Sequence, residues 1–302
     1  MADKLRRFFH KDNTIGYTFI FLWLFGFLAF TIIPMLMSLY FSFNNYNALG
    51  TPMWAGLDNY ITMFTKDPRF WTSFWNTLYY VVIYVPLRLA FALGVALLFS
   101  RQSKMTSIYR TAYYLPSIIG GSMAVAVMWR SIFGSRGLIN STLISLNLIA
   151  RPTSWINWPT TAMATLIVLA VWQFGSPMLI FMAGIKEIPR ALYEAAEVDG
   201  ARWGQRFRKI TLPMLTPVIF FNLVMQAISG FLTFTQSYVI TQGGPSDKTL
   251  LYVLYMYNNS FLYGKMGYGS AMAWFLLVFM SVVTLLLFKS SAAWVYYESA
   301  SE

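Results

Sequence analysis

The segment YTFIFLWLFGFLAFTIIPMLMSLYFSF, residues 17–43, carries no charged side chain over 27 positions. Crossing the roughly 30 Å of hydrocarbon in a bilayer takes about 20 helical residues, so this segment is long enough to span a membrane. It is also longer than the apolar core of a cleaved signal peptide, which has about 7 to 15 residues. We therefore expect it to remain in the protein as a membrane helix.

Further apolar blocks follow, and together they predict an all-α membrane protein with about six transmembrane helices. Hydrophobic residues make up 57% of the 302-residue chain and charged residues 11%, whereas soluble domains carry about 25% charged residues. The blocks do not alternate polar and apolar residues as barrel strands do, and helices satisfy their own backbone groups in lipid. The further predicted spans are 74–100, 110–133, 160–185, 214–240 and 266–288. We expect one membrane domain over 17–289, with tails at 1–16 and 290–302.

The lysine and arginine residues are divided unevenly between the two sides that these spans define. Fourteen fall on the side of the N-terminus: Lys4, Arg6, Arg7, Lys11, Arg101, Lys104, Arg110, Lys186, Arg190, Arg202, Arg206, Arg208, Lys209 and Lys289. Seven fall on the other side: Lys66, Arg69, Arg130, Arg136, Arg151, Lys248 and Lys265. Cytoplasmic loops are the richer ones in such residues, so both termini are predicted to be cytoplasmic. Membrane topology then explains the net charge of +11 better than nucleic-acid binding does.

The chain offers few side chains for catalysis or metal binding. It has no cysteine, and its single histidine, His10, lies beside Lys11 in the N-terminal tail. All eleven carboxylates fall outside the predicted spans, whereas ion-coupled transporters commonly place carboxylates or broken helices at the membrane midplane. Prolines interrupt several spans, at Pro34, Pro86, Pro116 and Pro177. Prolines alone indicate only kinks, so a secondary transporter and a membrane-embedded enzyme are the weaker alternatives.

Aromatic residues gather in two loops on the side opposite the termini. Such rings favour the headgroup layer, where an apolar body and a polar tip are both satisfied. We expect these loops to form short interfacial helices. Their aromatic residues are Trp54, Tyr60, Phe64, Phe70 and Trp71 before the second span, and Trp155 and Trp158 before the fourth.

A longer loop joins the fourth and fifth spans, and it reads KEIPRALYEAAEVDGARWGQRFRKITLPMLTP over residues 186–217. Pro189 suits the first turn of a helix, and Gly200 permits a turn after it. We expect helices over 189–199 and 201–210, with Pro213 ending the second one. The result is a charged helical hairpin at the membrane face. Its small residues could enter a groove of a partner, or the loop could simply connect two spans in solvent.

The spacing within this loop resembles a known family motif. Glu194-Ala195-Ala196 is followed by three residues, Gly200, nine residues and Ile210-Thr211-Leu212-Pro213. This pattern resembles the EAA loop of permease subunits in binding-protein-dependent ABC importers. Other segments resemble the carbohydrate branch of that family, and together they cover about residues 15–290. They are Gly56-Leu57-Asp58-Asn59-Tyr60, Asn76-Thr77-Leu78, Trp129 with Phe133, Gly243-Gly244-Pro245 and Gly267-Tyr268.

The resemblance implies a type I importer fold in a bacterial inner membrane, and import rather than export. It implies that the loop 186–213 forms a coupling helix that docks in a cleft of a cytoplasmic ATPase. The coupling residues would be Glu194, Ala195, Ala196, Gly200, Ile210, Leu212 and Pro213. The chain has no phosphate-binding loop of the G-x-x-x-x-G-K-[ST] type. ATP and Mg²⁺ would therefore bind to two separate ATPase subunits, alongside a second homologous permease and an extracytoplasmic solute-binding protein.

Polar residues in the membrane suggest a substrate path. In the fifth span they recur at spacings of 4, 3, 4 and 3, which places them on one helical face: Asn222, Gln226, Ser229, Thr233 and Gln236. Uncharged donors and acceptors suit hydroxyl-rich sugars, although polar residues also join membrane helices to one another. Gln173 and Ser176 could face the same cavity, whereas Gly120, Gly121 and Ser122 are expected to pack closely against a neighbour.

Arg88 lies mid-way along the second span, where similar permeases usually carry an uncharged residue. A mid-membrane arginine costs about 2.5 to 3.5 kcal/mol on insertion scales, and no carboxylate lies in any predicted span. Arg88 could extend its charged group toward the interface, pair with the second permease, or bind an anionic substrate such as a uronate oligosaccharide from alginate or pectin. A neutral oligosaccharide or glycerol phosphate is the alternative substrate.

Overall fold

The computed structural model describes residues 12–99 and 106–296. His10, the basic residues Lys4, Arg6, Arg7, Lys11, Arg101 and Lys104, and parts of both predicted tails lie outside these ranges. The described fold divides into two compact units. The first comprises residues 1–66 and 256–276, and the second comprises residues 67–255 and 277–302.

The first unit begins with a continuous helical run made of α2 (Asp12–Phe27), η1 (Leu28–Ile32) and α3 (Ile33–Ser42). Strands β1 (Asn44–Asn45) and β2 (Met53–Trp54) pair antiparallel, and α4 (Asp58–Thr65) follows them. The unit also holds η4 (Asn258–Leu262) and the first part of α16 (Met266–Trp294). The helix α4 is one of the short helices expected in the outer loops.

Residues of the Gly56–Tyr60 and Gly267–Tyr268 motifs hold this first unit together. The Asn59 side-chain amide donates to the carbonyl oxygens of Ser42 and Asn44, each at 2.9 Å. The backbone N–H of Gly267 donates to the carbonyl of Tyr46 at 3.0 Å, and a Cβ at this position would collide with the Asn44 carbonyl. In this structure the two motifs therefore fix the turn after α3.

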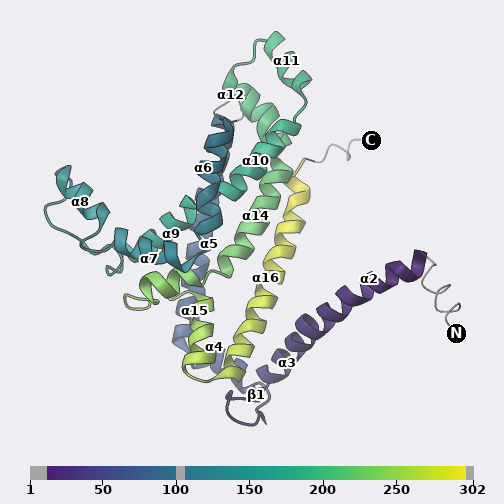
Figure 1. Cartoon of the computed structure of the whole chain (residues 1–302), viewed down its shortest axis with the longest axis vertical. Helices are drawn as coiled ribbons and strands as arrows, with labels where there is room; N and C mark the ends of the chain where they lie inside the picture. The colour runs from purple at the N-terminus through teal and green to yellow at the C-terminus, as the bar shows by residue number, and fades with distance from the viewer. Residues whose placement is uncertain (1–11, 100–105, 297–302) are drawn as a thin grey trace. The chain divides into compact units, whose positions relative to one another are not determined.

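The second unit is built around the long helix α5 (Pro68–Leu98). It packs against α9 (Ala162–Trp172), α10 (Gly175–Glu187) and α14 (Thr216–Phe231), as Figure 1 shows. Its remaining elements are α6 (Thr106–Ile119), α7 (Met123–Ile132), α8 (Leu138–Ser145), α11 (Arg190–Val198), α12 (Trp203–Arg206), η2 (Phe207–Thr211), α13 (Leu212–Met214), η3 (Ser237–Thr241), most of α15 (Tyr252–Tyr257) and the end of α16. Trp155 and Trp158 lie in turns between α8 and α9, so the interfacial helix expected around them is absent.

By length and composition, three helical stretches within the described ranges could each cross a membrane: Ile20–Ser42, Pro68–Leu98 and Met266–Trp294. Three bent pairs qualify when each pair counts as one span. The bend is 98° between α6 and α7, 41° between α9 and α10, and 62° between Trp203–Met214 and α14. These stretches account for six spans, although half of them are not straight.

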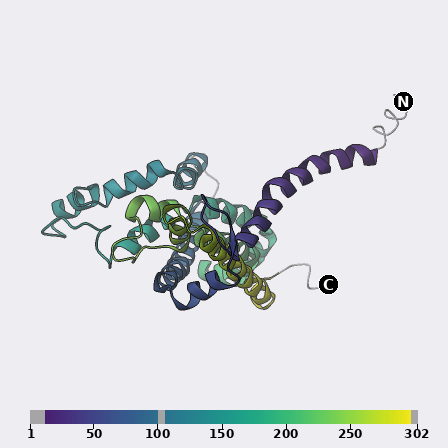
Figure 2. The same cartoon turned by 90° about the horizontal axis from the view of Figure 1, so that it is seen from below.

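The bends correct several predicted boundaries. The third predicted span, 110–133, is interrupted at residues 120–122, because Ser122 accepts from the backbone N–H of Val125 and starts a new helix. Figure 2 shows α7 turned away from the direction of α6. The fifth predicted span, 214–240, ends as a helix at Phe231, and α16 runs to Trp294, into the predicted C-terminal tail.

Pro213 was expected to end the second hairpin helix, and the continuous helical run Trp203–Met214 ends one residue after it. The chain bends by 62° there, and α14 begins beyond the bend with Pro217 in its first turn. Proline lacks only an N–H that the first turn of a helix leaves unpaired, so Pro217 is compatible with the start of α14.

Glycine allows α6 and α10 to pack closely. A Cβ on Gly175 would lie 2.5 Å from the Tyr113 carbonyl oxygen and 2.7 Å from the Cα of Tyr114. Both atoms belong to the backbone and cannot rotate away. We therefore predict that Gly175→Ala lowers the stability of the purified protein by about 1 to 3 kcal/mol, the usual cost of overpacking.

Thermal unfolding in detergent measures this effect. Gly121→Ala is the matched control, because a Cβ there would meet no atom within 4 Å. Equal melting temperatures for the two variants would contradict the close packing of α6 on α10.

Candidate functional site

The loop between α10 and α14 forms a helical hairpin, made of α11 and of the continuous run α12–η2–α13. Pro189 was expected in the first turn of the helix, and it lies directly before α11 as the N-cap residue. Gly200 has a φ of +72°, a conformation that strains residues with a Cβ. The backbone N–H groups of Asp199, Gly200 and Ala201 donate hydrogen bonds to carbonyl oxygens in the last turn of α11. The turn thus occurs at the predicted glycine.

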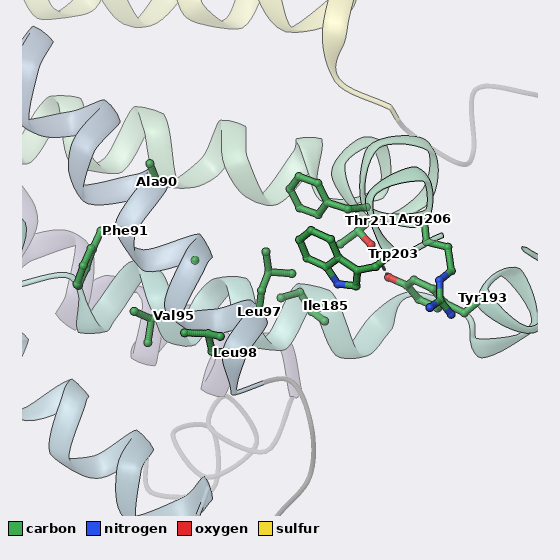
Figure 3. Close-up of a pocket in the computed structure, with 12 residues that line it drawn as sticks. Ala90, Phe91, Val95, Leu97, Leu98, Ile185, Tyr193, Trp203, Arg206 and Thr211 are labelled. Carbon is green, nitrogen blue, oxygen red and sulfur yellow. Dashed lines mark hydrogen bonds between the residues drawn. The ribbon is translucent and has the colours of Figure 1, made fainter. Parts of the chain in front are cut away.

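Two side-chain contacts hold the halves of the hairpin together. The hydroxyls of Tyr193 and Thr211 are 2.9 Å apart (Figure 3). The guanidinium of Arg206 forms an ion pair with Glu197. Thr211 is buried, whereas the Glu197 carboxylate is largely exposed. Figure 1 shows the hairpin at the end of α10 and α14. Both contacts therefore link α11 to the run that leads into α14.

Most residues of α11 are exposed, and none is buried. Glu194 and Ala195 are exposed, Ala196 is half-buried, and Val198 is 89% exposed. The Glu194 carboxylate has no hydrogen bond or ion pair among the described residues. Ile210, Leu212 and Pro213 are half-buried and belong to the base of the hairpin. The predicted coupling residues therefore form an exposed tip and a partly buried base.

A second cluster of polar contacts lies where α9 meets α10. The carbonyl oxygen of Gln173 accepts from the Arg88 guanidinium and, at 2.8 Å, from the Ser117 hydroxyl. The Ser117 oxygen in turn accepts from the backbone N–H of Ser176 at 3.0 Å. The side-chain amide of Gln173 donates to the Gly120 carbonyl at 3.0 Å. One glutamine thus joins the bend of the fourth span to the bend of the third.

This cluster changes the interpretation of three predicted path residues. Gln173 is 9% exposed and its amide is engaged at the bend. Ser176 is half-buried, and its backbone takes part in the cluster. Arg88, for which no internal partner was expected, donates to a backbone carbonyl, although its Nε is buried with no hydrogen-bond partner in the described ranges. Close packing at Gly120 occurs as predicted, since a Cβ there would collide with Gln173.

The polar residues of the fifth span do not form the continuous stripe that their spacing predicted. Asn222 is fully buried and Gln226 half-buried, each with a buried side-chain oxygen that has no hydrogen-bond partner within the described residues, while Ser229 is exposed. Thr233 and Gln236 lie beyond the end of α14, so the helical register does not extend to them. Only the first three residues share one helix.

A third polar cluster, at the start of α5, was not predicted from the sequence. Arg69 donates twice to the Asp247 carboxylate, at 2.7 and 2.8 Å, and the Asn76 amide donates to the Asp247 carbonyl at 2.6 Å. Asp67 caps α5 and accepts from the Tyr255 hydroxyl at 2.7 Å. The residues that meet here are 171 to 188 positions apart. The cluster fixes the loop after η3 onto α5.

Comparison with known proteins agrees with this architecture. Residues 89–295 match the model of the family described as "Binding-protein-dependent transport system inner membrane component". The chain belongs to this family. It is 55% identical to the probable ABC transporter permease protein YesP of Bacillus subtilis, over 100% of this chain and 98% of YesP. It is 34% identical to AraP of the same organism, a permease of an arabinooligosaccharide transport system, over 95% of this chain and 92% of AraP.

A solved bacterial ABC transporter that imports the acidic polysaccharide alginate has the same fold. Its matching chain has a TM-score of 0.80 at 22% identity, covering 96% of this chain and 98% of that one. These comparisons confirm the all-α membrane fold with about six spans and the resemblance to sugar-importer permeases. The chain is a multi-pass inner-membrane permease, a transport subunit rather than an enzyme.

The polar cluster at the bends suggests that Gln173 supports the fold. We predict that Gln173→Leu lowers the melting temperature of the purified permease, because it leaves the Gly120 carbonyl without this donor. The loss should be about 0.6 to 1.7 kcal/mol, the range measured for hydrogen bonds between membrane helices. Ser229→Ala is the control, since Ser229 is exposed on α14. An unchanged melting temperature together with lost transport would show instead that Gln173 contacts substrate.

Proposed function

We propose that this permease imports an acidic oligosaccharide, such as a uronate oligosaccharide of the alginate or pectin type, in an ATP-driven complex. A solute-binding protein delivers the substrate, a second homologous permease completes the pathway, and two ATPase subunits bind ATP and Mg²⁺. The family supports dependence on a binding protein. The names of relatives support a sugar substrate: AraP serves arabinooligosaccharides, and the lactose permease LacF of Rhizobium radiobacter is 30% identical over 87% of this chain.

The hairpin is the site of ATPase docking in this proposal. Its tip exposes Glu194 and Ala195 to solvent. Because the side chains of Ala195 and Ala196 are small, this face of the helix could fit into a groove of a partner. Glu194 has no partner among the described residues, so its carboxylate is available to a basic residue of the ATPase. The distribution of lysine and arginine supports a cytoplasmic hairpin and cytoplasmic termini.

The environment of Arg88 is the observation that supports an acidic substrate. Neither the ion pair of Arg69 with Asp247 nor that of Arg206 with Glu197 involves Arg88. Its charge is therefore held inside a membrane bundle against a neutral carbonyl, with the buried Nε unpaired. A charge in this setting costs about 2.5 to 3.5 kcal/mol on insertion scales. A substrate carboxylate would offset that cost while the substrate passes.

A neutral oligosaccharide remains the second candidate, and a specific contact favours it. Arg88 donates to the Gln173 carbonyl, which the break between α9 and α10 leaves without a helical partner. Backbone groups in the membrane must be satisfied within the protein, and Arg88 shares this structural role with the Ser117 hydroxyl. Under this alternative, Arg88 serves the bend and not the substrate.

Substitution of Arg88 separates the two candidates. We predict that Arg88→Gln lowers uptake of uronate oligosaccharide into proteoliposomes at least tenfold, because a hydrogen bond to a charged group contributes about 1.5 to 3 kcal/mol. Uptake of a neutral oligosaccharide of equal length serves as the reference, and Arg88→Lys should retain part of the uronate uptake. Equal losses for both sugars, with a lower melting temperature, would support the structural alternative.

Substitution at the hairpin tip tests coupling. We predict that Glu194→Ala reduces ATPase activity stimulated by the loaded binding protein about tenfold or more while membrane insertion is preserved, because an interfacial charge partner is lost. Asp199→Asn is the matched control, an exposed carboxylate just after the same helix. Unchanged stimulated activity in Glu194→Ala would argue against docking through this residue.

A further inference from the structure

A cavity of about 960 Å³ lies between the end of α5 and the hairpin (Figure 3). One wall comes from α5 and includes Phe91, Val95 and Leu98. The other comes from the hairpin and includes Trp203 and Phe207. The cavity begins beyond Arg88, the arginine of the proposed substrate path, and none of the path residues lines it.

The wall formed by α5 is apolar and open. Phe91 is 51% exposed and Leu98 is 76% exposed, both on a helix long and apolar enough to cross a membrane. Between them, Gly94 leaves a slot in which an added Cβ would meet no atom within 4 Å. This wall offers a sugar no hydrogen-bonding side chain, but it suits a hydrocarbon chain.

The wall formed by the hairpin has the composition of a membrane interface. Trp203 stacks on Phe207 with ring centroids 5.7 Å apart and planes 6° apart, and Trp203 is 67% exposed. Tyr193 also lines this wall and directs its hydroxyl to Thr211. Tryptophan and tyrosine are enriched at the level of lipid headgroups, where an apolar ring and a polar tip are both satisfied.

The rim of the cavity is cationic. Arg206 lines it, and Arg202, Arg208 and Lys209 lie close by in the chain and are exposed. Among the described residues, the one ion pair in this stretch is that of Arg206 with Glu197. Basic pockets next to membrane helices on the cytoplasmic side recognise anionic lipid headgroups. The charge of the rim therefore complements a phosphate that bears a net negative charge.

We infer that this cavity binds one anionic phospholipid of the cytoplasmic leaflet. Its acyl chains lie along Phe91, Gly94 and Leu98, and its phosphate lies beside Arg206. The inference rests on the proposed function in one respect: it takes the hairpin to lie on the cytoplasmic side of the membrane. A lipid in this position contacts both a membrane span and the segment proposed to dock the ATPase.

Native mass spectrometry of the complete transport complex tests the inference. The complex is taken from nanodiscs that contain equal amounts of phosphatidylglycerol and phosphatidylcholine. The wild-type complex should retain phosphatidylglycerol at least tenfold over phosphatidylcholine at one position. Gly94→Leu fills the slot in α5 and should reduce retention of that lipid at least tenfold.

Two variants of the ion pair isolate the role of the charge. Arg206→Gln should lose the preference for phosphatidylglycerol, whereas Glu197→Gln should keep it, because it breaks the same ion pair and leaves the cation in place. A structural effect of breaking the pair would appear equally in both variants.

The inference is overturned if the wild-type complex retains the two lipids equally, or if Arg206→Gln and Gly94→Leu leave retention unchanged. The same results would follow if the second permease or another segment of this chain filled the cavity. Lipid retention is measured without transport, so a failure here is distinguishable from a failure of the proposed substrate or of the ATPase docking.

Discussion

Backbone groups freed by a bend inside a membrane bundle must find partners within the protein, and the rest of this structure depends on how that is achieved. Where α9 gives way to α10, the carbonyl of Gln173 receives donors from Arg88 on α5 and Ser117 on α6. The Gln173 side chain satisfies the Gly120 carbonyl at the bend between α6 and α7. A single polar cluster thus allows two spans to bend and ties three parts of the bundle to one point.

Helix α10 connects this cluster to the hairpin. Helix α10 runs from Gly175, two residues after Gln173, to Glu187 at the base of the hairpin. Its 13 residues give a rigid element about 20 Å long. At its far end Gly184 packs so closely on Val218 of α14 that a Cβ would lie 2.7 Å from the valine methyl group. Helix α10 thus links the polar cluster at the bends to the base of the hairpin, and it packs closely on α14 near that base.

The sequence predicted features that depend on local composition, and it missed those that depend on distant partners. Uncharged blocks predicted the spans, and Gly200 predicted the hairpin turn. The bend at residues 120–122 was missed because the sequence is equally apolar on both sides of it. The end of α14 at Phe231 was missed for the same reason, and so Thr233 and Gln236 were assigned to a helix that does not reach them. Arg88 and Gln173 are 85 positions apart, and nothing in either local sequence indicates their contact.

We propose that the tip of the hairpin faces the cytoplasm and contacts a separate ATPase. The chain has no native cysteine, so Ala195→Cys introduces a single reactive thiol at the exposed tip. In intact cells this thiol should resist a membrane-impermeant maleimide, and in isolated membranes a short bifunctional cross-linker should join it to an ATPase subunit. Labelling from outside the cell, or cross-linking to no ATPase in an intact complex, would contradict the account.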